Sequence, residues 1–366
     1  MTILLQSDWE KHPRAIVHTN TRNTSFLAIS AQYAEQDIKN HSFMLALHNP
    51  DLRDVDPFDP NLTDEQKVAV AMEARDNMWY ALRECFRVPG IGHLDSSFVE
   101  ANRGNIAMWW SFGMRMTVGL QQIRQTGKTT STHILLAWLL NLGMTNTKGC
   151  LTTKDEMMAR AHATNVRQII DELPPYLNLR DHPDSTDAYN VTANALGNDI
   201  AVLYPHLAVR RAINQGRGMT FPLLVADDLP YQINGQHSFP TMIAAMCAAA
   251  QRAHDTNQPY GVIIPTPAGK RDTPEGEFVY QMFSGFAKWT DAFFDCDSLH
   301  TLYEIVRNLS PEGRYAVWIE MNHTDLGKSD EWLQARLAES RITGDDAERE
   351  YFNKWTGVPY QEPQAK

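Results

Sequence analysis

The sequence has few cysteines and no pattern that would use them. Its four cysteines, Cys85, Cys150, Cys247 and Cys296, lie far apart and form no C-x-x-C pair. Structural zinc sites and disulfide frameworks need cysteines at short, regular spacings. We therefore expect inert thiols in a reducing compartment, and neither a zinc centre nor a fold that depends on disulfides.

Long apolar runs and an excess of basic residues are also absent. The longest apolar run, 134–142, is broken by Asn141 and is shorter than the roughly 18 residues that a membrane span needs. The first residues have no basic segment followed by a cleavage site, so we expect a cytoplasmic protein without a membrane partner. The formal net charge of -11 excludes a uniformly basic surface that coats nucleic acid. Any DNA contact would have to be a local patch, or one shared among subunits.

What is present is a hydrophobic fraction of 43% over 366 residues, enough for a substantial core. From about residue 116, short apolar runs alternate with amphipathic stretches, which predicts an α/β fold with a parallel sheet flanked by helices. The predicted strands are 117–121, 149–153, 221–226, 261–264, 289–294 and 315–321, with a hairpin at 189–192 and 200–204. The predicted helices are 63–87, 128–142, 155–174, 238–253, 275–283, 299–309, 330–339 and 345–355.

A phosphate-binding loop follows the first strand of this core. Residues 122–129 read Q-I-R-Q-T-G-K-T and lie between a predicted strand and a predicted helix, the context that the motif requires. In such a loop the backbone N–H groups surround the β-phosphate, the lysine neutralises charge and the threonine hydroxyl binds Mg²⁺. Gly127, Lys128 and Thr129 take these roles, so the sequence predicts ATP and Mg²⁺ binding. Gln122 replaces the leading glycine of the usual pattern.

Two carboxylates follow the apolar strand that ends at Ala226. The carboxyl ends of parallel strands lie at the edge of the sheet that carries the phosphate loop. Asp227 is therefore expected to hold Mg²⁺, and Asp228 to orient or deprotonate the attacking water. A further strand end, 265–269, is a polar turn that could sense the γ-phosphate and pass its loss to a neighbouring subdomain.

Arginines supply the remaining positive charge for phosphoryl transfer. An arginine that meets the γ-phosphate can be worth about 10³ to 10⁵ in rate. Arg124 lies inside the loop and could act within its own subunit, whereas Arg217 lies on a glycine-flanked loop that could reach a neighbour. A surface ion pair is the alternative for Arg217, and Arg210 and Arg211 are lesser candidates.

These elements, in this order and spacing, resemble the ATPase domain of the large terminase, the DNA-packaging motor of tailed bacteriophages, most closely the T4-like type. The most specific piece is 124–130, R-Q-T-G-K-T-T, because terminases replace the first loop glycine and carry R-Q-x-G-K-T. The similarity extends through 172–174 (E-L-P), Arg217-Gly218, Asp227-Asp228, 266–269 (T-P-A-G), 350–352 (E-Y-F) and Gly357.

The resemblance implies a P-loop NTPase of the ASCE/RecA-like class with a small lid subdomain built from N- and C-terminal segments. It implies one ATPase domain over 1–366, with a helical or lid portion to about 110, a core from about 115 to 295 and a C-terminal portion from about 296. The family also carries a C-terminal nuclease, which we expect to be truncated or on another chain, so nuclease activity is not expected here.

The resemblance also assigns roles to residues. Mg²⁺ would be held by Thr129 and Asp227, Asp228 stands where a catalytic glutamate usually lies, and Thr266 belongs to the coupling motif. An aspartate places its carboxylate roughly 1.5 Å further back than a glutamate, one C–C bond. Arg124 matches a cis-acting and Arg217 a trans-acting arginine, and both assignments stay open. The residues expected to bind ATP are Gln125, Thr126, Gly127, Lys128, Thr129 and Thr130. For the adenine-contacting motif, Asn102, Arg103 and Asn105 are guesses.

The implied function is ATP hydrolysis that drives double-stranded DNA into the procapsid, in the host bacterial cytoplasm and transiently at the portal. The implied partners are DNA, the portal protein, the small terminase subunit and further copies of this chain in a ring, expected to be a pentamer. Two alternatives remain open. A helicase-like translocase would need a second motor domain, and a nucleotide-gated assembly module would follow if Asp228 made hydrolysis too slow to matter.

Overall fold

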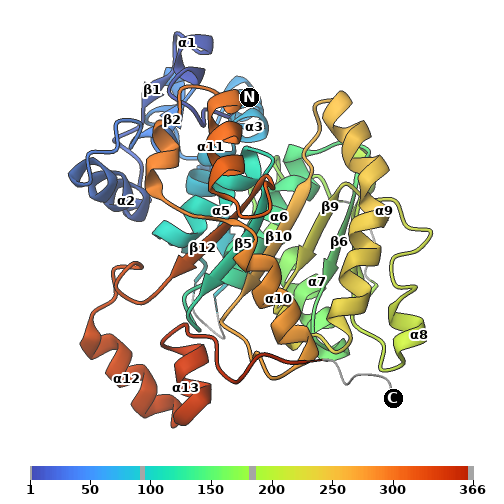
Figure 1. Cartoon of the computed structure of the whole chain (residues 1–366). Coiled ribbons are helices and arrows are strands. Elements are labelled where there is room, and N and C mark those ends of the chain that lie inside the picture. The colour runs from blue at the N-terminus through green and yellow to red at the C-terminus, as the bar shows by residue number, and fades with distance from the viewer. Residues whose placement is uncertain (1, 91–94, 181–186, 362–366) are drawn as a thin grey trace.

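The computed structural model describes residues 2–90, 95–180 and 187–361. Within these residues, eight strands form one sheet in the order β11-β12-β5-β10-β9-β6-β8-β7 (Figure 1). The strands are β5 (Thr117–Gln122), β6 (Lys148–Thr152), β7 (Asn190–Ala193), β8 (Asn198–Leu203), β9 (Leu223–Ala226), β10 (Gly261–Thr266), β11 (Ala287–Lys288) and β12 (Ala316–Met321). Two short hairpins lie outside it, β1 (Ile16–Val17) with β2 (Ala46–Leu47) and β3 (Arg87–Val88) with β4 (Ser97–Phe98).

The sheet is parallel except for β7, which pairs antiparallel with β8. This confirms the predicted α/β class and the predicted hairpin. β10 lies between β5 and β9, with Thr266 opposite Gln121 in the register. The phosphate-loop strand and the aspartate strand are therefore separated by one strand, and the tip of that strand reaches the same edge as both.

Helices cover both faces of the sheet (Figure 1). α5, α6 and α7 pack on one face, and α9 and α10 on the other. Alternate side chains of β9 explain the two layers, since Leu223 and Val225 enter one buried cluster and Leu224 and Ala226 enter the other. The longer helices are α2 (Thr24–Glu35), α3 (Asp64–Asp76), α5 (Arg103–Gly113), α6 (Lys128–Trp138), α7 (Glu156–Asp171), α9 (Gly235–Asp255), α10 (Pro274–Ser284), α11 (Leu299–Leu309) and α12 (Asp330–Ser340). The shorter helices are α1 (Asp8–Lys11), α4 (Met78–Tyr80), α8 (Val209–Ala212) and α13 (Gly344–Glu350).

The predicted strand at 289–294 is wrong. Only Ala287–Lys288 pairs with β12, and Asp291–Asp295 forms a 3₁₀ turn that Thr290 caps by accepting from the N–H of Ala292. The aromatic residues that suggested a strand fill the core of the N-terminal portion instead: Phe294 packs against Tyr33, with ring centroids 5.0 Å apart. Burial among aromatic rings and burial in a sheet give the same apolar run in a sequence, so the pattern could not separate them.

The predicted helix at 63–87 is divided at Asn77. Thr63 caps its start with the expected capping box, but the Asn77 side chain accepts from the N–H of Tyr80 and begins α4. Among the described residues no helix is both long and apolar enough to cross a bilayer.

The domain boundaries stay a prediction, although two contacts cross them. β12, from the portion after residue 296, pairs with β5 in the sheet of the core. The Asn40 side chain in the N-terminal portion donates to the carbonyl of Phe294 at 3.1 Å.

Candidate active site

The loop between β5 and α6 has the backbone conformation that a phosphate cradle needs. Gly127 caps α6 with a φ of 84°, and a Cβ there would meet nothing within 4 Å. Gln125 also has a positive φ, 61°. Arg124, Gln125 and Gly127 are exposed, whereas Lys128 is buried, with an exposed fraction of 9%. The loop amides therefore lie at the surface, at the N-terminus of a helix, where an anion is favoured.

Gln122, which stands where the usual motif has glycine, braces this loop. Its amide nitrogen donates to the carbonyl of Thr126 at 3.0 Å and to the Thr126 hydroxyl at 2.7 Å. The Thr126 hydroxyl in turn donates to the carbonyl of Ile123 at 2.7 Å. Gly104 of α5 makes room for this amide, since a Cβ there would overlap it. The replacement of the leading glycine is therefore paired with a glycine elsewhere, which the loop sequence alone did not reveal.

Of the three residues guessed for the adenine site, Asn102 reaches the loop. Its side-chain nitrogen lies 3.4 Å from the carbonyl of Thr126, while Arg103 pairs with Asp291. Asn105 donates to the Ser131 hydroxyl at 3.1 Å. Asn102 and Asn105 thus contact the start of α6 or the loop ahead of it, and their part in adenine recognition stays a prediction.

The structure brings Thr129 and Asp227 together. The Thr129 hydroxyl donates to Asp227 Oδ1 at 3.1 Å, across 98 residues of sequence. A hydroxyl and a carboxylate side by side are hard oxygen ligands of the kind that Mg²⁺ uses together with substrate phosphates. The described residues contain no group of three or more His, Cys, Asp and Glu that could hold a metal by themselves. The pair fits a nucleotide-borne Mg²⁺, which needs only one or two carboxylates from the protein.

Asp228 follows with an unusual backbone and a free carboxylate oxygen. Its φ is 55°, in the left-handed region, and its N–H donates to the carbonyl of Pro265 at 2.9 Å. Aspartate adopts this region more readily than most residues. Asp228 Oδ1 is buried without a hydrogen-bond partner. Burial and the neighbouring Asp227 charge raise the pKa of Asp228 to about 6.

Asp227 has the opposite electrostatic setting. Burial opposes its ionisation, but a hydrogen bond from His162 and nearby positive charge outweigh burial and lower the pKa of Asp227. His162 Nε2 lies 3.3 Å from Asp227 Oδ2. No sequence pattern distinguishes His162, because a histidine on the inner face of an amphipathic helix gives the same pattern as an ordinary core residue.

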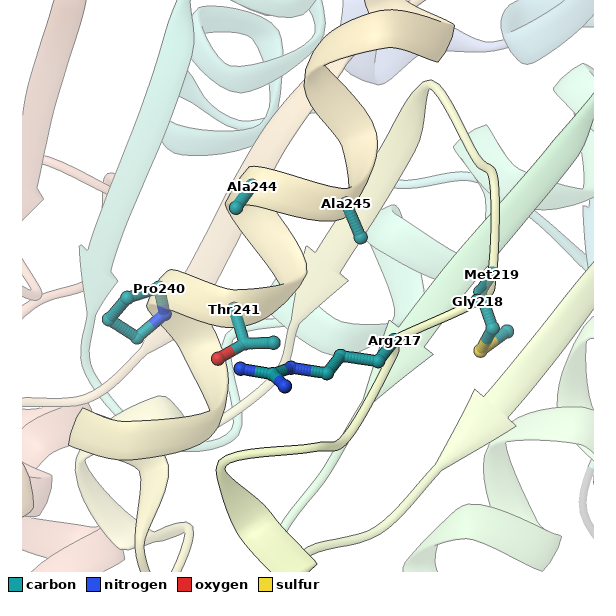
Figure 2. Close-up of a pocket in the computed structure, with 7 residues that line it drawn as sticks. All are labelled: Arg217, Gly218, Met219, Pro240, Thr241, Ala244 and Ala245. Atoms are coloured by element: carbon teal, nitrogen blue, oxygen red, sulfur yellow. The ribbon is translucent and has the colours of Figure 1, made fainter.

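The two candidate arginines lie in different places. The Arg124 backbone N–H donates to the carbonyl of Glu350 at 2.7 Å, and its guanidinium lies 3.6 Å from the Glu350 carboxylate. Arg217 is exposed on the loop before β9 and lies against α9, outside the phosphate loop (Figure 2). With six other residues it lines a hollow of about 450 Å³, namely Gly218, Met219, Pro240, Thr241, Ala244 and Ala245. Arg210 and Arg211 are exposed on α8.

Thr266 ends β10 between the two halves of the site. It is fully buried, and its hydroxyl donates to the carbonyl of Pro267 at 2.8 Å. Gly269, at the end of the same turn, lies so close to Trp355 that a Cβ would approach its ring to 2.7 Å. Trp355 in turn donates to the Gln121 side chain at 2.7 Å. The turn that follows β10 is therefore in direct contact with the C-terminal segment.

No protein-family model and no curated protein matches the chain. Solved structures do show similarity. The ATPase domain of the Thermus phage P74-26 large terminase has a TM-score of 0.44 and 14% identity, covering 70% of this chain and 94% of that one. The HK97 bacteriophage large terminase has a TM-score of 0.48 and 11% identity, covering 78% and 55%. The large terminase of a thermophilic bacteriophage in complex with ADP has a TM-score of 0.41 and 12% identity, covering 70% and 54%.

These proteins are large terminases, the family that the motifs of this chain resemble. The chain corresponds to 55% of the HK97 protein's length and 54% of the length of the terminase solved with ADP. At this low similarity, the assignment of function depends on the residues of the site itself.

Proposed function

We propose that this protein is a Mg²⁺-dependent ATPase that powers the packaging of double-stranded DNA as the motor domain of a phage large terminase. The observation that carries the ATPase proposal is the contact between the Thr129 hydroxyl and Asp227 Oδ1 at 3.1 Å, at the start of the helix that follows the phosphate loop. Beside this pair stands Asp228, a carboxylate with an oxygen that has no partner. A metal-binding pair and a free base at one sheet edge are what water attack on a γ-phosphate requires.

Different residues of the chain would bind the phosphates, hold Mg²⁺ and activate the water. The amides of 125–127 and the Lys128 ammonium bind the phosphates, joined by Thr130 in the first turn of α6. Thr129 and Asp227 would hold Mg²⁺, which neutralises charge on the β- and γ-phosphates when bound. Asp228, once ionised, accepts a proton from the attacking water. Arg124 or Arg217 supplies positive charge to the γ-phosphate, from the same subunit or from a neighbour.

Coupling to movement would start at Thr266. This is supported by the position of β10 between β5, which leads into the proposed phosphate loop, and β9, which leads into the proposed water-activating Asp228. The turn after it touches the C-terminal segment at Trp355, so loss of the γ-phosphate can be passed to that segment as a change in packing.

The proposal of a DNA-packaging role is supported by the R-Q-x-G-K-T loop and by the order of the motifs. The motor would assemble as a homo-oligomeric ring, expected to be a pentamer, with the portal protein and the small terminase subunit in the host cytoplasm. DNA would contact Lys and Arg side chains on loops of several subunits, which suits a subunit with a net charge of -11.

A turnover assay tests the proposal against its alternatives. Steady phosphate release that double-stranded DNA and portal stimulate supports the motor. Stoichiometric ATP binding without release would reject hydrolysis and favour the nucleotide-gated assembly module. Release coupled to separation of the DNA strands would favour the helicase-like translocase.

A further inference from the structure

Two buried histidines stand behind the metal-binding aspartate. His133 lies on α6, one turn after Thr129, and His162 lies on α7. Their exposed fractions are 3% and 1%, and that of Asp227 is 2%. His133 Nε2 and His162 Nδ1 are 2.5 Å apart, and His162 Nε2 lies 3.3 Å from Asp227 Oδ2. A continuous line of hydrogen-bonding groups therefore runs from α6 through α7 to the aspartate.

The position of the hydrogens follows from donor and acceptor chemistry. A contact of 2.5 Å between two ring nitrogens requires that one carry a hydrogen and the other accept it. If His133 Nε2 donates, neutral His162 keeps its hydrogen on Nε2. If His162 Nδ1 donates, a bare Nε2 would face a carboxylate with no hydrogen between two acceptors, which is repulsive. In each favourable arrangement His162 Nε2 carries a hydrogen directed at Asp227.

A neutral His133 is compatible with the first of these arrangements. Burial and the neighbouring His162 lower the pKa of His133 to about 3, so His133 carries one ring hydrogen near pH 7, which it can donate from Nε2. A neutral His133 that donates from Nε2 fixes the tautomer of His162. The Thr153 hydroxyl, 3.1 Å from His162 Nε2, also touches this nitrogen and keeps the ring in place at the end of β6.

The two oxygens of Asp227 thus have separate partners. Oδ1 accepts from Thr129 and Oδ2 faces His162. A histidine that only filled space in the core would not need to contact the Asp227 carboxylate. Metal-binding groups are commonly oriented by such an outer partner, whose loss typically costs about 10- to 100-fold in metal affinity.

We infer that His162 is a positioning residue for Asp227: it donates to Oδ2 and so keeps Oδ1 directed at Thr129, ready for Mg²⁺, while His133 fixes the tautomer of His162. This inference rests on the proposed function in so far as Mg²⁺ arrives with ATP. It does not depend on hydrolysis, because it concerns how the ionised Asp227 is held. It assigns the histidine pair a purpose that neither the loop motif nor the aspartate motif contains.

Two substitutions of equal chemistry but different reach test it. In His162→Gln the amide nitrogen stands as many bonds from Cβ as Nε2 does, so it can still donate to Asp227. In His162→Asn the amide reaches only as far as Nδ1 and cannot. His162→Leu removes both nitrogens, and thermal melting of all three variants reports whether the fold survives.

The readout is the affinity for ATP-γ-S, measured by calorimetry in EDTA and at a series of Mg²⁺ concentrations. The wild type should bind more tightly as Mg²⁺ is added. His162→Asn and His162→Leu should need roughly 10-fold more Mg²⁺ for the same effect, with affinity in EDTA unchanged, and His162→Gln should stay within about 3-fold of the wild type. If His162→Leu does not fold, the comparison of Gln with Asn decides.

Two results would overturn the inference: equal Mg²⁺ dependence in the Gln and Asn variants, or no Mg²⁺ dependence in the wild type. Phosphate release is scored separately. A wild type that binds ATP-γ-S with Mg²⁺ but never hydrolyses ATP would reject the proposed ATPase and leave the positioning role to be judged by the Gln and Asn variants.

Discussion

The Arg124 backbone N–H donates to the carbonyl of Glu350 at 2.7 Å, so the phosphate loop is joined to the last turn of α13. The guanidinium of Arg124 lies 3.6 Å from the Glu350 carboxylate and is half exposed. An exposed ion pair of this kind is worth only about 0 to 1 kcal/mol. The Arg124 guanidinium could therefore leave Glu350 and pair with a γ-phosphate with little loss of free energy, while the backbone hydrogen bond keeps the loop in place.

Glu350→Gln should therefore raise ATP turnover if Arg124 is the working arginine. The substitution keeps the backbone hydrogen bond and removes the competing carboxylate, and we expect an increase of roughly 2- to 5-fold, the equivalent of a weak ion pair. The measurement is steady-state phosphate release. Glu348→Gln, which loses only the pair with Lys354, is the matched control. Unchanged turnover in both variants would count against a cis role for Arg124.

Lys128→Ala should abolish hydrolysis without unfolding the chain. Lys128 is the charge that the loop motif itself directs at the phosphates, and its loss should lower turnover by at least roughly 100-fold. The control is Lys148→Ala, an exposed lysine at the opposite end of the sheet, where β6 begins. Phosphate release and thermal melting are measured on both. Normal turnover in Lys128→Ala would reject the nucleotide site.

Asp228→Asn should retain nucleotide binding and lose turnover by roughly 10² to 10⁴-fold, the usual worth of a general base. The base must be ionised, and the pKa of Asp228 in the free protein is raised to about 6. In the wild type, kcat/KM should therefore rise with pH between about 5 and 7 and then level off, since this ratio reports the free enzyme. A profile that is flat across this range, or an active Asp228→Asn, would remove Asp228 from the role.

The same substitution should stabilise the protein at high pH. The folded state holds the Asp228 proton more tightly than the unfolded chain does, because the pKa rises from 3.8 to about 6 on folding. The free energy of unfolding therefore falls as pH rises across that window. At pH 8 the free energy of unfolding of Asp228→Asn should exceed that of the wild type by roughly 1 to 3 kcal/mol, and near pH 4 the two proteins should differ little.

Urea denaturation in EDTA measures this effect. Asp227→Asn is the matched control, because the fold lowers the pKa of Asp227. The charge of Asp227 therefore stabilises the folded protein at pH values above the pKa that this residue has in the unfolded chain. That variant should be less stable than the wild type at pH 8. An Asp228→Asn protein no more stable than the wild type at pH 8 would contradict the assigned electrostatics.

Mixing subunits separates a trans from a cis role for Arg217. The residue is exposed and lies against α9, outside its own phosphate loop. If it serves a neighbour, inactive Arg217→Ala subunits should regain turnover when mixed with Asp228→Asn subunits, because each supplies what the other lacks. The measurement is phosphate release across mixing ratios. Additive, unrescued activity would place Arg217 outside the neighbouring site.

Much of the sheet could be predicted because its strands are short apolar runs in the sequence and are buried between helices on both faces in the structure. β9 is a short apolar run with neighbours on both faces, and it appears where the run 221–226 predicted it. Phe294 shows the opposite case: its run of aromatic residues packs against the N-terminal portion, and no local feature distinguishes that packing from a strand.

The sequence by itself predicted a phosphate-binding loop and, after it, a strand that ends in two aspartates, because the strand, the glycine, the lysine and the carboxylates form patterns that are local to the chain. Tertiary structure alone decided how these pieces meet. Gly104 leaves room for Gln122, and a line of contacts runs from His133 through His162 to Asp227. Both join residues that are not neighbours in the sequence. The left-handed backbone of Asp228 is likewise a property of the folded chain. Such contacts depend on which helix packs on which strand, and no local pattern encodes that choice.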